Sequence, residues 1–182
     1  YVLYKGIPNI SWEFLSTKPS HLAERIGILP DILNTVYIVL ATLVIVLPLG
    51  VGAAIYLTEY AQNKRVVAAI EYAAETLSGI PSIIYGLVGM LVLVPAVRSI
   101  YHVPDGASLL AAIIVLAIMI LPSIIKVSVT ALDAVPKEYE DASLALGASP
   151  VETFFRVSVP AAKSGIAAAV VLGVGRAIGE AM

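Results

Sequence analysis

The chain has 182 residues, of which 59% are hydrophobic and only 13% are charged. Ordinary soluble domains carry about 25% charged residues, so a single soluble domain is a poor fit. A formal net charge of −2 without a basic run gives no indication of nucleic-acid binding, and the lack of cysteine excludes disulfides, thiolate metal sites and thiol nucleophiles.

Residues 1–31 are polar and rich in turn-forming residues, and we expect them to form an external loop. The first long apolar stretch follows, because Asp31 and Glu59 bracket 27 residues without a charge. A helix needs about 20 apolar residues to cross the hydrocarbon core of a bilayer. The stretch therefore predicts a spanning helix over 32–58, with a kink near Pro48.

A polar loop, 59–65, separates this helix from a mixed segment, 66–78. Glu71 and Glu75 lie four residues apart there, so both fall on one helical face, which we expect to contact water at the membrane surface. Glu75 and Arg98 then bracket 22 uncharged residues. Because Gly79 and Pro81 break a helix, the second spanning segment is predicted over Ile80–Val97.

The third apolar stretch holds 20 uncharged residues between Asp105 and Lys126, and it predicts a spanning helix over Leu109–Leu132. Lys126 can extend its ammonium to the interface from there. A fourth apolar segment, 161–182, is interrupted by Arg176 and Glu180. Together these segments predict one all-α, polytopic transmembrane domain over 1–182, with about four to five spanning helices and its first three spans within 32–132.

The polar stretch 133–160 carries its own helix signals. Pro136 is predicted at the first position of a helix, the acidic residues that follow it suit the first turn, and Gly147 suits the C-terminus. Ser149 to Glu152 form a capping-box pattern that starts a second helix, and we expect Pro160 to end it. The stretch thus predicts a short helix–turn–helix outside the membrane. Loops on its side of the membrane hold six Lys and Arg residues against four on the other, which favours the cytoplasm.

Few residues could carry chemistry. There is no P-loop, and the two histidines, His21 and His102, lie 81 residues apart, so we expect neither a metal site, a cofactor nor catalysis. Arg176 and Glu180 are the exceptions, because charges at membrane depth are costly. They either form a pair that fixes helix packing or line a translocation path. Gly175 and Gly179, one residue before each charge, form a G-x-x-x-G pattern typical of close helix packing.

The polar stretch also resembles the cytoplasmic loop E-A-A-x-x-x-G-x(9)-I-x-L-P of membrane subunits of bacterial ABC importers. The spacing is intact, although Asp replaces Glu, Ser replaces Ala, and Val replaces Ile and Leu. In that family the loop docks on the ATPase. The resemblance therefore implies an ATPase-coupling role for Asp141, Ala142, Ser143, Gly147, Ala148, Ser149 and Pro160.

Longer segments resemble the PstA/PstC family of phosphate importer permeases. They are P-L-G-V-G-A-A-I-Y-L-T-E-Y (48–60), S-G-I-P-S-I-I-Y-G-L (78–87), P-A-A-K-S-G-I (160–166) and G-R-A-I-G-E (175–180). The loop F-L-S-T-K-P (14–19) favours PstA. The family's usual six-helix core would imply that a helix is missing at each end of the chain.

This resemblance implies the membrane-spanning subunit of an ATP-driven phosphate importer in a bacterial or archaeal cell membrane. Its expected partners are a homologous permease subunit, two ATPase subunits and an extracytoplasmic phosphate-binding protein. Arg176 and Glu180 would line the substrate path. Two alternatives stay open: a permease for another oxyanion such as molybdate or sulfate, and a membrane-embedded enzyme that uses Glu180 as an acid or base.

Overall fold

The computed structural model describes residues 6–7, 10–19, 27–61, 63–102 and 108–181, and these residues contain helices but no strands. The first elements along the chain are α2 (Trp12–Ser16), α3 (Leu29–Ile55), the π-helical turn η2 (Tyr56–Tyr60) and α4 (Lys64–Ser78). Next come α5 (Ser82–Val88), η3 (Gly89–Leu93), α6 (Val94–Tyr101) and α7 (Leu109–Asp133). The remaining elements are α8 (Lys137–Ala145), α9 (Pro150–Thr153), η4 (Phe154–Ser158), α10 (Val159–Ala161) and α11 (Lys163–Ala181).

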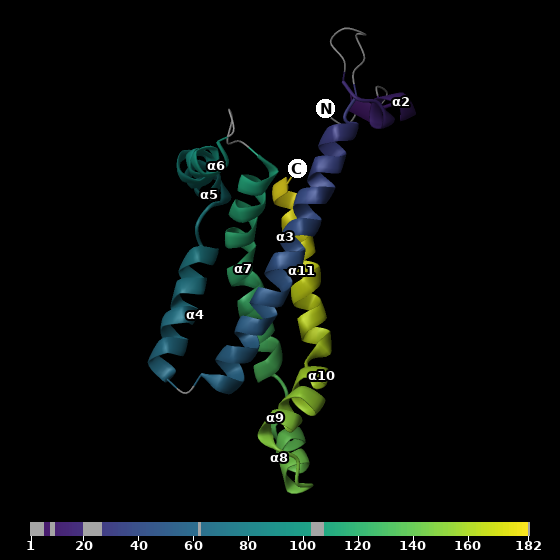
Figure 1. Ribbon diagram of the computed structural model, residues 1–182. Helices are drawn as coiled ribbons and strands as arrows, with labels where there is room; N and C mark the ends of the chain where they lie inside the picture. The colour runs from purple at the N-terminus through teal and green to yellow at the C-terminus, as the bar shows by residue number, and fades with distance from the viewer. Residues whose placement is uncertain (1–5, 8–9, 20–26, 62, 103–107, 182) are drawn as a thin grey trace.

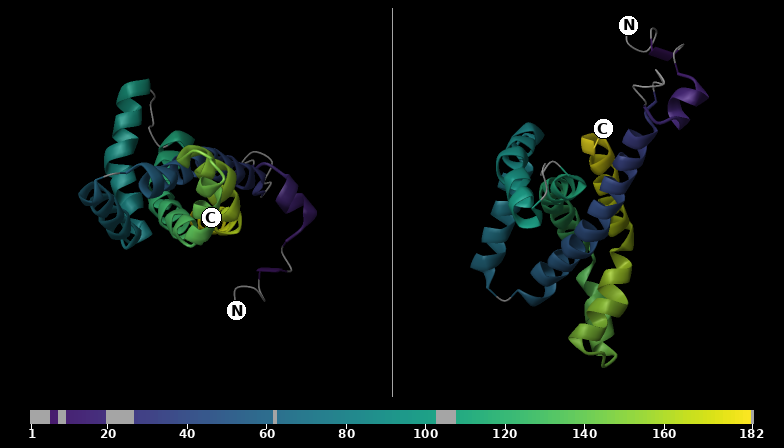
Figure 2. Two further views of the ribbon diagram at one scale, coloured as in Figure 1. Left: turned by 90° about the horizontal axis from the view of Figure 1, so that it is seen from below. Right: turned by 45° about the horizontal axis from the view of Figure 1, so that its top comes forward.

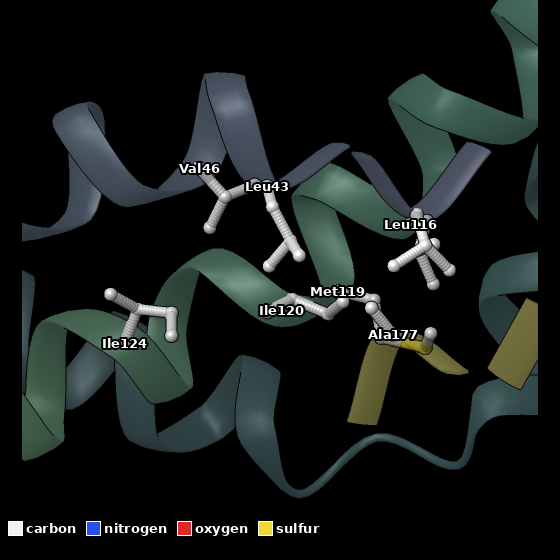
Figure 3. Packing of buried hydrophobic residues seen from close by; sticks show 8 residues of the cluster. Leu43, Val46, Leu116, Met119, Ile120, Ile124 and Ala177 are labelled. Atoms are coloured by element: carbon white, nitrogen blue, oxygen red, sulfur yellow. The ribbon is translucent and has the colours of Figure 1, made fainter. Parts of the chain in front are cut away.

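Three long helices, α3, α7 and α11, lie side by side and form the bundle (Figure 1). Their shared core contains Val39, Leu43, Val46, Leu116, Met119, Ile120, Ile124 and Ala177, most of which are labelled in Figure 3. Ile120 and Ile124 of α7 are fully buried at its centre. The bundle is therefore organised around α7, whose side chains contact both neighbouring helices.

Glycines bring the neighbouring helices close to α7. A Cβ added at Gly50 of α3 would lie 2.6 Å from Cγ2 of Ile124, and one added at Gly173 of α11 would lie 2.5 Å from Cδ1 of the same side chain. Real Cβ atoms are not found so near another carbon. Gly165 of α11 meets Ala131 in the same way, at 2.4 Å from its Cβ. Small residues that allow backbones to approach are the usual packing device of membrane helices.

Four helical segments are long and apolar enough to cross a membrane, namely Leu29–Tyr60, Ser82–Tyr101, Leu109–Asp133 and Lys163–Ala181. The prediction of an all-α bundle with about four such segments is confirmed. The first segment is longer than the predicted 32–58, because η2 continues α3 past Glu59 with no break in the helical backbone.

The segment between α3 and α7 differs from the prediction. The α4 helix packs lengthwise along the C-terminal half of α7, whereas α5, η3 and α6 lie across the long axis of the bundle (Figures 1 and 2). The break predicted at Gly79 and Pro81 is present, since α4 ends at Ser78 and α5 begins at Ser82. The face of Glu71 and Glu75 was expected to contact water; both Glu75 and its partner are exposed, and Glu75 also forms an ion pair with Lys126 of α7.

The polar stretch after α7 folds as a hairpin of α8 and α9, as predicted. Two details differ. Pro136 is the N-cap of α8 and not its first residue. Pro160 does not end the helical path, because η4 leads into α10 and Pro160 falls in the first turn of that segment. A proline is tolerated in a first turn because its missing N–H has no partner to lose there.

The two ends of the bundle are distinct. The α2 helix, the α5–α6 arm and the end of α11 lie together at one end (Figure 1). The connection from η2 to α4 and the α8–α9 hairpin lie at the other, and the hairpin projects farthest (Figure 2). We call these the outer and the inner end.

The contact at Ile124 gives a matched test on one helix. Gly50→Ala is expected to lower the stability of the full-length protein by about 1–3 kcal/mol, because the added methyl overpacks the buried Ile124. Gly52→Ala should have no effect or stabilise slightly, because a Cβ there meets nothing within 4 Å. Thermal unfolding in detergent measures both, and equal melting temperatures for the two variants would contradict the packing described here.

Candidate functional site

Arg176 is a charged residue held between two helices of the bundle. Its guanidinium Nη1 donates a hydrogen bond to Oγ of Ser123 on α7, with 2.7 Å between the two atoms. The side chain is half-buried, and Ala177 beside it is fully buried. Arg176 therefore extends from α11 to α7, where a neutral hydroxyl oxygen accepts from it.

A pair between Arg176 and Glu180 was one of the two alternatives from the sequence, and no ion pair joins them within the part of the chain that the structure describes. The spacing of four residues places both side chains on one face of α11. Ser123, however, lies opposite Arg176 and accepts a hydrogen bond from the guanidinium across the helix interface. Glu180 is exposed and lines a separate space.

That space is a cavity of about 790 Å³ at the outer end, between α3, α7, α11 and the α5–η3 arm. Most of its lining is apolar, with the polar side chains of Asn34, Ser82 and Ser108 and the carboxylate of Glu180. Met119 also lines it. Met119 lies one helical turn before Ser123 on α7, and Glu180 lies one turn after Arg176 on α11. The Arg176–Ser123 bond therefore lies just inward of the cavity.

Gly175 and Gly179 do not pack against any helix of this chain that the structure describes. A Cβ at either position would meet nothing within 4 Å, and both residues are exposed. The close contacts of α11 are made by Gly165 and Gly173 instead. The packing role predicted for the G-x-x-x-G pattern stays a prediction, which would need a helix beyond those described.

A second cation lies farther inward. Nζ of Lys126 is 3.1 Å from Oε1 of Glu75, and both side chains are exposed to solvent. This pair ties α4 to α7 beside a smaller cavity of about 270 Å³, which Glu71 and Asp133 also line. Unlike Arg176, Lys126 has a carboxylate as its partner.

The α8–α9 hairpin is built by short-range contacts. Ser149 caps α9: its hydroxyl accepts from the backbone N–H of Glu152 at 3.3 Å, and the Glu152 carboxylate accepts from the backbone N–H of Ser149 at 3.2 Å. These bonds, with Arg156 nearby, hold the pKa of Glu152 below its ordinary value. Because the pKa is lowered, the cap is complete at neutral pH and is lost only as pH falls through that lowered pKa.

Gly147 forms the turn of the hairpin with φ of +88°, as its predicted role at a helix end requires. Across the turn, the hydroxyls of Ser143 and Thr153 lie 2.8 Å apart. Asp141, Ala142, Gly147 and Ser149 are exposed, and so is Pro160, whereas Ser143 and Ala148 are half-buried. Large apolar side chains also face solvent here, above all Leu146 at 90% exposure.

Metal chemistry finds no support in the described residues, where no three His, Cys, Asp or Glu side chains gather. His21 lies outside the described residues. His102 ends α6 in a left-handed conformation, with φ of 54°.

A family model described as "Binding-protein-dependent transport system inner membrane component" matches residues 46–182. The chain belongs to this family. The probable ABC transporter permease protein YqgH of Bacillus subtilis (strain 168) is 41% identical to this transport component over 185 residues, covering 99% of the chain and 58% of the relative. The phosphate transport system permease protein PstC of Mesorhizobium japonicum is 33% identical over 199 residues, covering 98% of the chain and 61% of the relative.

A solved structure of an ABC transporter has a similar fold. A chain of the MetNI methionine ABC transporter, in an inward facing conformation, superimposes on this transport component with a TM-score of 0.61 and 26% identity. The match covers 85% of the component and 69% of that chain. The component spans about three fifths of the length of the curated relatives. The leaning towards PstA stays a prediction, because the phosphate relative is a PstC protein.

The hairpin turn yields a test that separates backbone strain from steric contact. No atom lies within 4 Å of a Cβ built on Gly147, so any cost of a side chain comes from the positive φ. Gly147→Val is expected to destabilise the turn by about 1–2 kcal/mol, and Gly147→Asn by clearly less. Hydrogen exchange of the α8 and α9 amides in the full-length protein should rise for Val and little for Asn; equal protection in the two variants would contradict the strain.

Proposed function

We propose that the chain forms the membrane-spanning core of a permease subunit in an ATP-driven phosphate importer. Membership of a transport family, four helices of spanning length and similarity to a phosphate permease support this. The observation that carries the proposal furthest is Arg176: a half-buried guanidinium inside an apolar helix, just inward of a cavity of about 790 Å³.

The chemistry of phosphate explains why an arginine at this position supports the proposal. Phosphate carries a charge between −1 and −2 near neutral pH, and a bare anion would cross the membrane centre at a prohibitive cost. Arginine keeps its charge at any physiological pH and offers a planar fork of donors that suits phosphate oxygens. Among the described contacts, Ser123 accepts only from Nη1, so the other guanidinium donors are left for a ligand.

Glu180 would moderate this site. It lies one turn outward of Arg176 and lines the cavity through which an anion would arrive. A carboxylate there repels an anion that lingers near the outer end. Transport then requires two states of the bundle, each favoured by a different ligand or partner.

The inner end would contact the ATPase. The hairpin presents Asp141, Ala142, Ser143, Gly147, Ala148 and Ser149 with exposed apolar residues such as Leu146, and Pro160 follows at its base. Two ATPase subunits, a homologous permease subunit and an extracytoplasmic phosphate-binding protein would complete the importer. The exposed Gly175 and Gly179 would receive a helix that the described residues do not include.

A permease for another oxyanion, such as molybdate or sulfate, is the second candidate. The fold alone does not choose between substrates, since the similar solved structure is of a methionine transporter. The PstC relative favours phosphate. A membrane-embedded enzyme that uses Glu180 has the least support, because the family model describes transport components. We place the protein in a cell membrane as a multi-pass subunit; the relatives described above are bacterial.

The proposed topology puts the hairpin in the cytoplasm and α2 outside. The 182 residues contain no cysteine, so a cysteine introduced here is the only one among them, and any cysteine elsewhere in the full-length protein is first replaced by serine. Ser149→Cys and Ser11→Cys should react with an impermeant maleimide from opposite sides of the membrane, since the exposed residues lie at opposite ends of the bundle. Reaction of both from the same side would overturn the topology.

Arg176→Gln tests the path. It removes the charge but keeps a side chain that can donate to Ser123. Phosphate uptake by the complete transporter is expected to fall at least tenfold, because a hydrogen bond to a charged group contributes about 1.5–3 kcal/mol. Arg98→Gln, a change on α6 away from the bundle core, is the control and should transport normally. Near-normal uptake by an assembled Arg176→Gln transporter would contradict the path, whereas loss of assembly would favour a packing role.

A further inference from the structure

Several hydroxyl groups in these helices bond within their own helix, and Ser123 does not. Thr35, Thr58, Thr76, Ser78 and Thr130 each donate to the carbonyl oxygen four residues earlier in their own helix. Ser123 instead accepts from Nη1 of Arg176, and among the described residues its hydroxyl donates to no backbone carbonyl. A serine oxygen can accept and donate at once, so the proton of Ser123 is left for another partner.

The position of that proton relates it to the cavity. Met119, one turn before Ser123 on α7, lines the cavity, and so does Glu180, one turn after Arg176 on α11. The two helices run in opposite directions, so these turns both lead towards the outer end. The Arg176–Ser123 bond therefore joins α7 and α11 at the inner limit of the space that an incoming ligand would occupy.

We propose that Ser123 is a ligand-binding residue of the same site: it orients Arg176 through Nη1 and donates its own proton to an oxyanion held by the guanidinium. This inference rests on the proposed function and names a residue that the charge pattern of the sequence does not reveal. A site made of Arg N–H and Ser O–H groups offers only donors. It therefore selects a ligand whose oxygens are acceptors, which is the chemistry of a tetrahedral oxyanion.

Ser123 has a second effect on the same guanidinium. By accepting at 2.7 Å, it holds Arg176 towards α7 and away from Glu180, which shares its helical face. A guanidinium bound to a neutral oxygen has no counter-charge beside it, whereas a carboxylate partner would offset its attraction for an anion. Loss of the hydroxyl would thus weaken binding both directly and by releasing Arg176 towards Glu180.

The test uses the complete transporter in proteoliposomes with labelled inorganic phosphate. Ser123→Ala is expected to raise KM for phosphate about tenfold with little change in kcat, because a hydrogen bond to an anion is lost. Ser123→Thr keeps the hydroxyl and should restore KM. Thr130→Ala is the matched control, because the hydroxyl of Thr130 serves only its own helix in the described contacts, and it should leave KM unchanged.

A double variant separates this inference from the proposed function. If Ser123 acts through and beside Arg176, adding Ser123→Ala to Arg176→Gln should cost much less than it does alone. A normal KM for Ser123→Ala, with uptake lost in Arg176→Gln, would overturn the role of Ser123 and leave the phosphate path standing. Normal uptake in both would overturn the path itself. A fall in kcat without a change in KM, or failure of Ser123→Thr to restore KM, would reduce Ser123 to a packing residue.

Should Ser123→Ala fail to assemble, Ser123→Cys keeps the side-chain size and replaces a strong donor by a weak one. The same rise in KM is then expected in an assembled transporter. An unchanged KM for the cysteine variant would overturn the proposal.

Discussion

One isoleucine sets the spacing and register of the bundle. Ile124 of α7 is fully buried, and its side chain meets Gly50 of α3 on one side and Gly173 of α11 on the other. In lipid, apolar side chains gain little from association alone, so helices are held by close packing at small residues. The polar contact follows from this: Ser123 precedes Ile124, Arg176 lies three residues after Gly173, and the register that seats Ile124 brings the two side chains together.

The inner hairpin packs against the inner end of the bundle. Ala54, Leu132, Phe154 and Ala162 form a second buried cluster, with contributions from α3, α7 and the turns that follow α9. Beside it, Ser158 donates to the Glu140 carboxylate at 2.7 Å. Packed interiors do not deform gradually, so a force on α8 reaches the inner ends of α3 and α11. This is the mechanical requirement for coupling a surface hairpin to a path inside the membrane.

The class of fold could be predicted from the sequence because an uncharged apolar stretch of about 20 residues is what a helix needs to cross the hydrocarbon core of a bilayer. The sequence also predicted the turn at Gly147 and the cap at Ser149, since both depend on residues only a few positions apart. The arrangement of α4 and of the α5–α6 arm depends on contacts with α7, such as Glu75 with Lys126, and a local pattern does not contain these.

Only part of the candidate site could be predicted from the sequence, because the rest depends on contacts between helices. A buried-charge argument found Arg176 and Glu180, but their spacing of four residues suggested an ion pair that the described residues do not form. A serine inside an apolar spanning stretch was the available signal for Ser123, yet only the register of α7 against α11 gives it a partner. The G-x-x-x-G pattern likewise named Gly175 and Gly179, while Gly165 and Gly173 make the contacts.

Arg176 of α11 and Lys126 of α7 both lie at interfaces of α7, but their partners differ. Ser123, Lys126 and Thr130 recur at spacings of three and four, so they lie on one stripe of α7. Arg176 meets this stripe through a neutral hydroxyl, whereas Lys126 meets Glu75 and has Glu71 and Asp133 beside it. Acidic neighbours cancel the attraction of Lys126 for an anion. Under the proposed function, phosphate is held at Arg176 and is not held again at Lys126, which favours release towards the inner end.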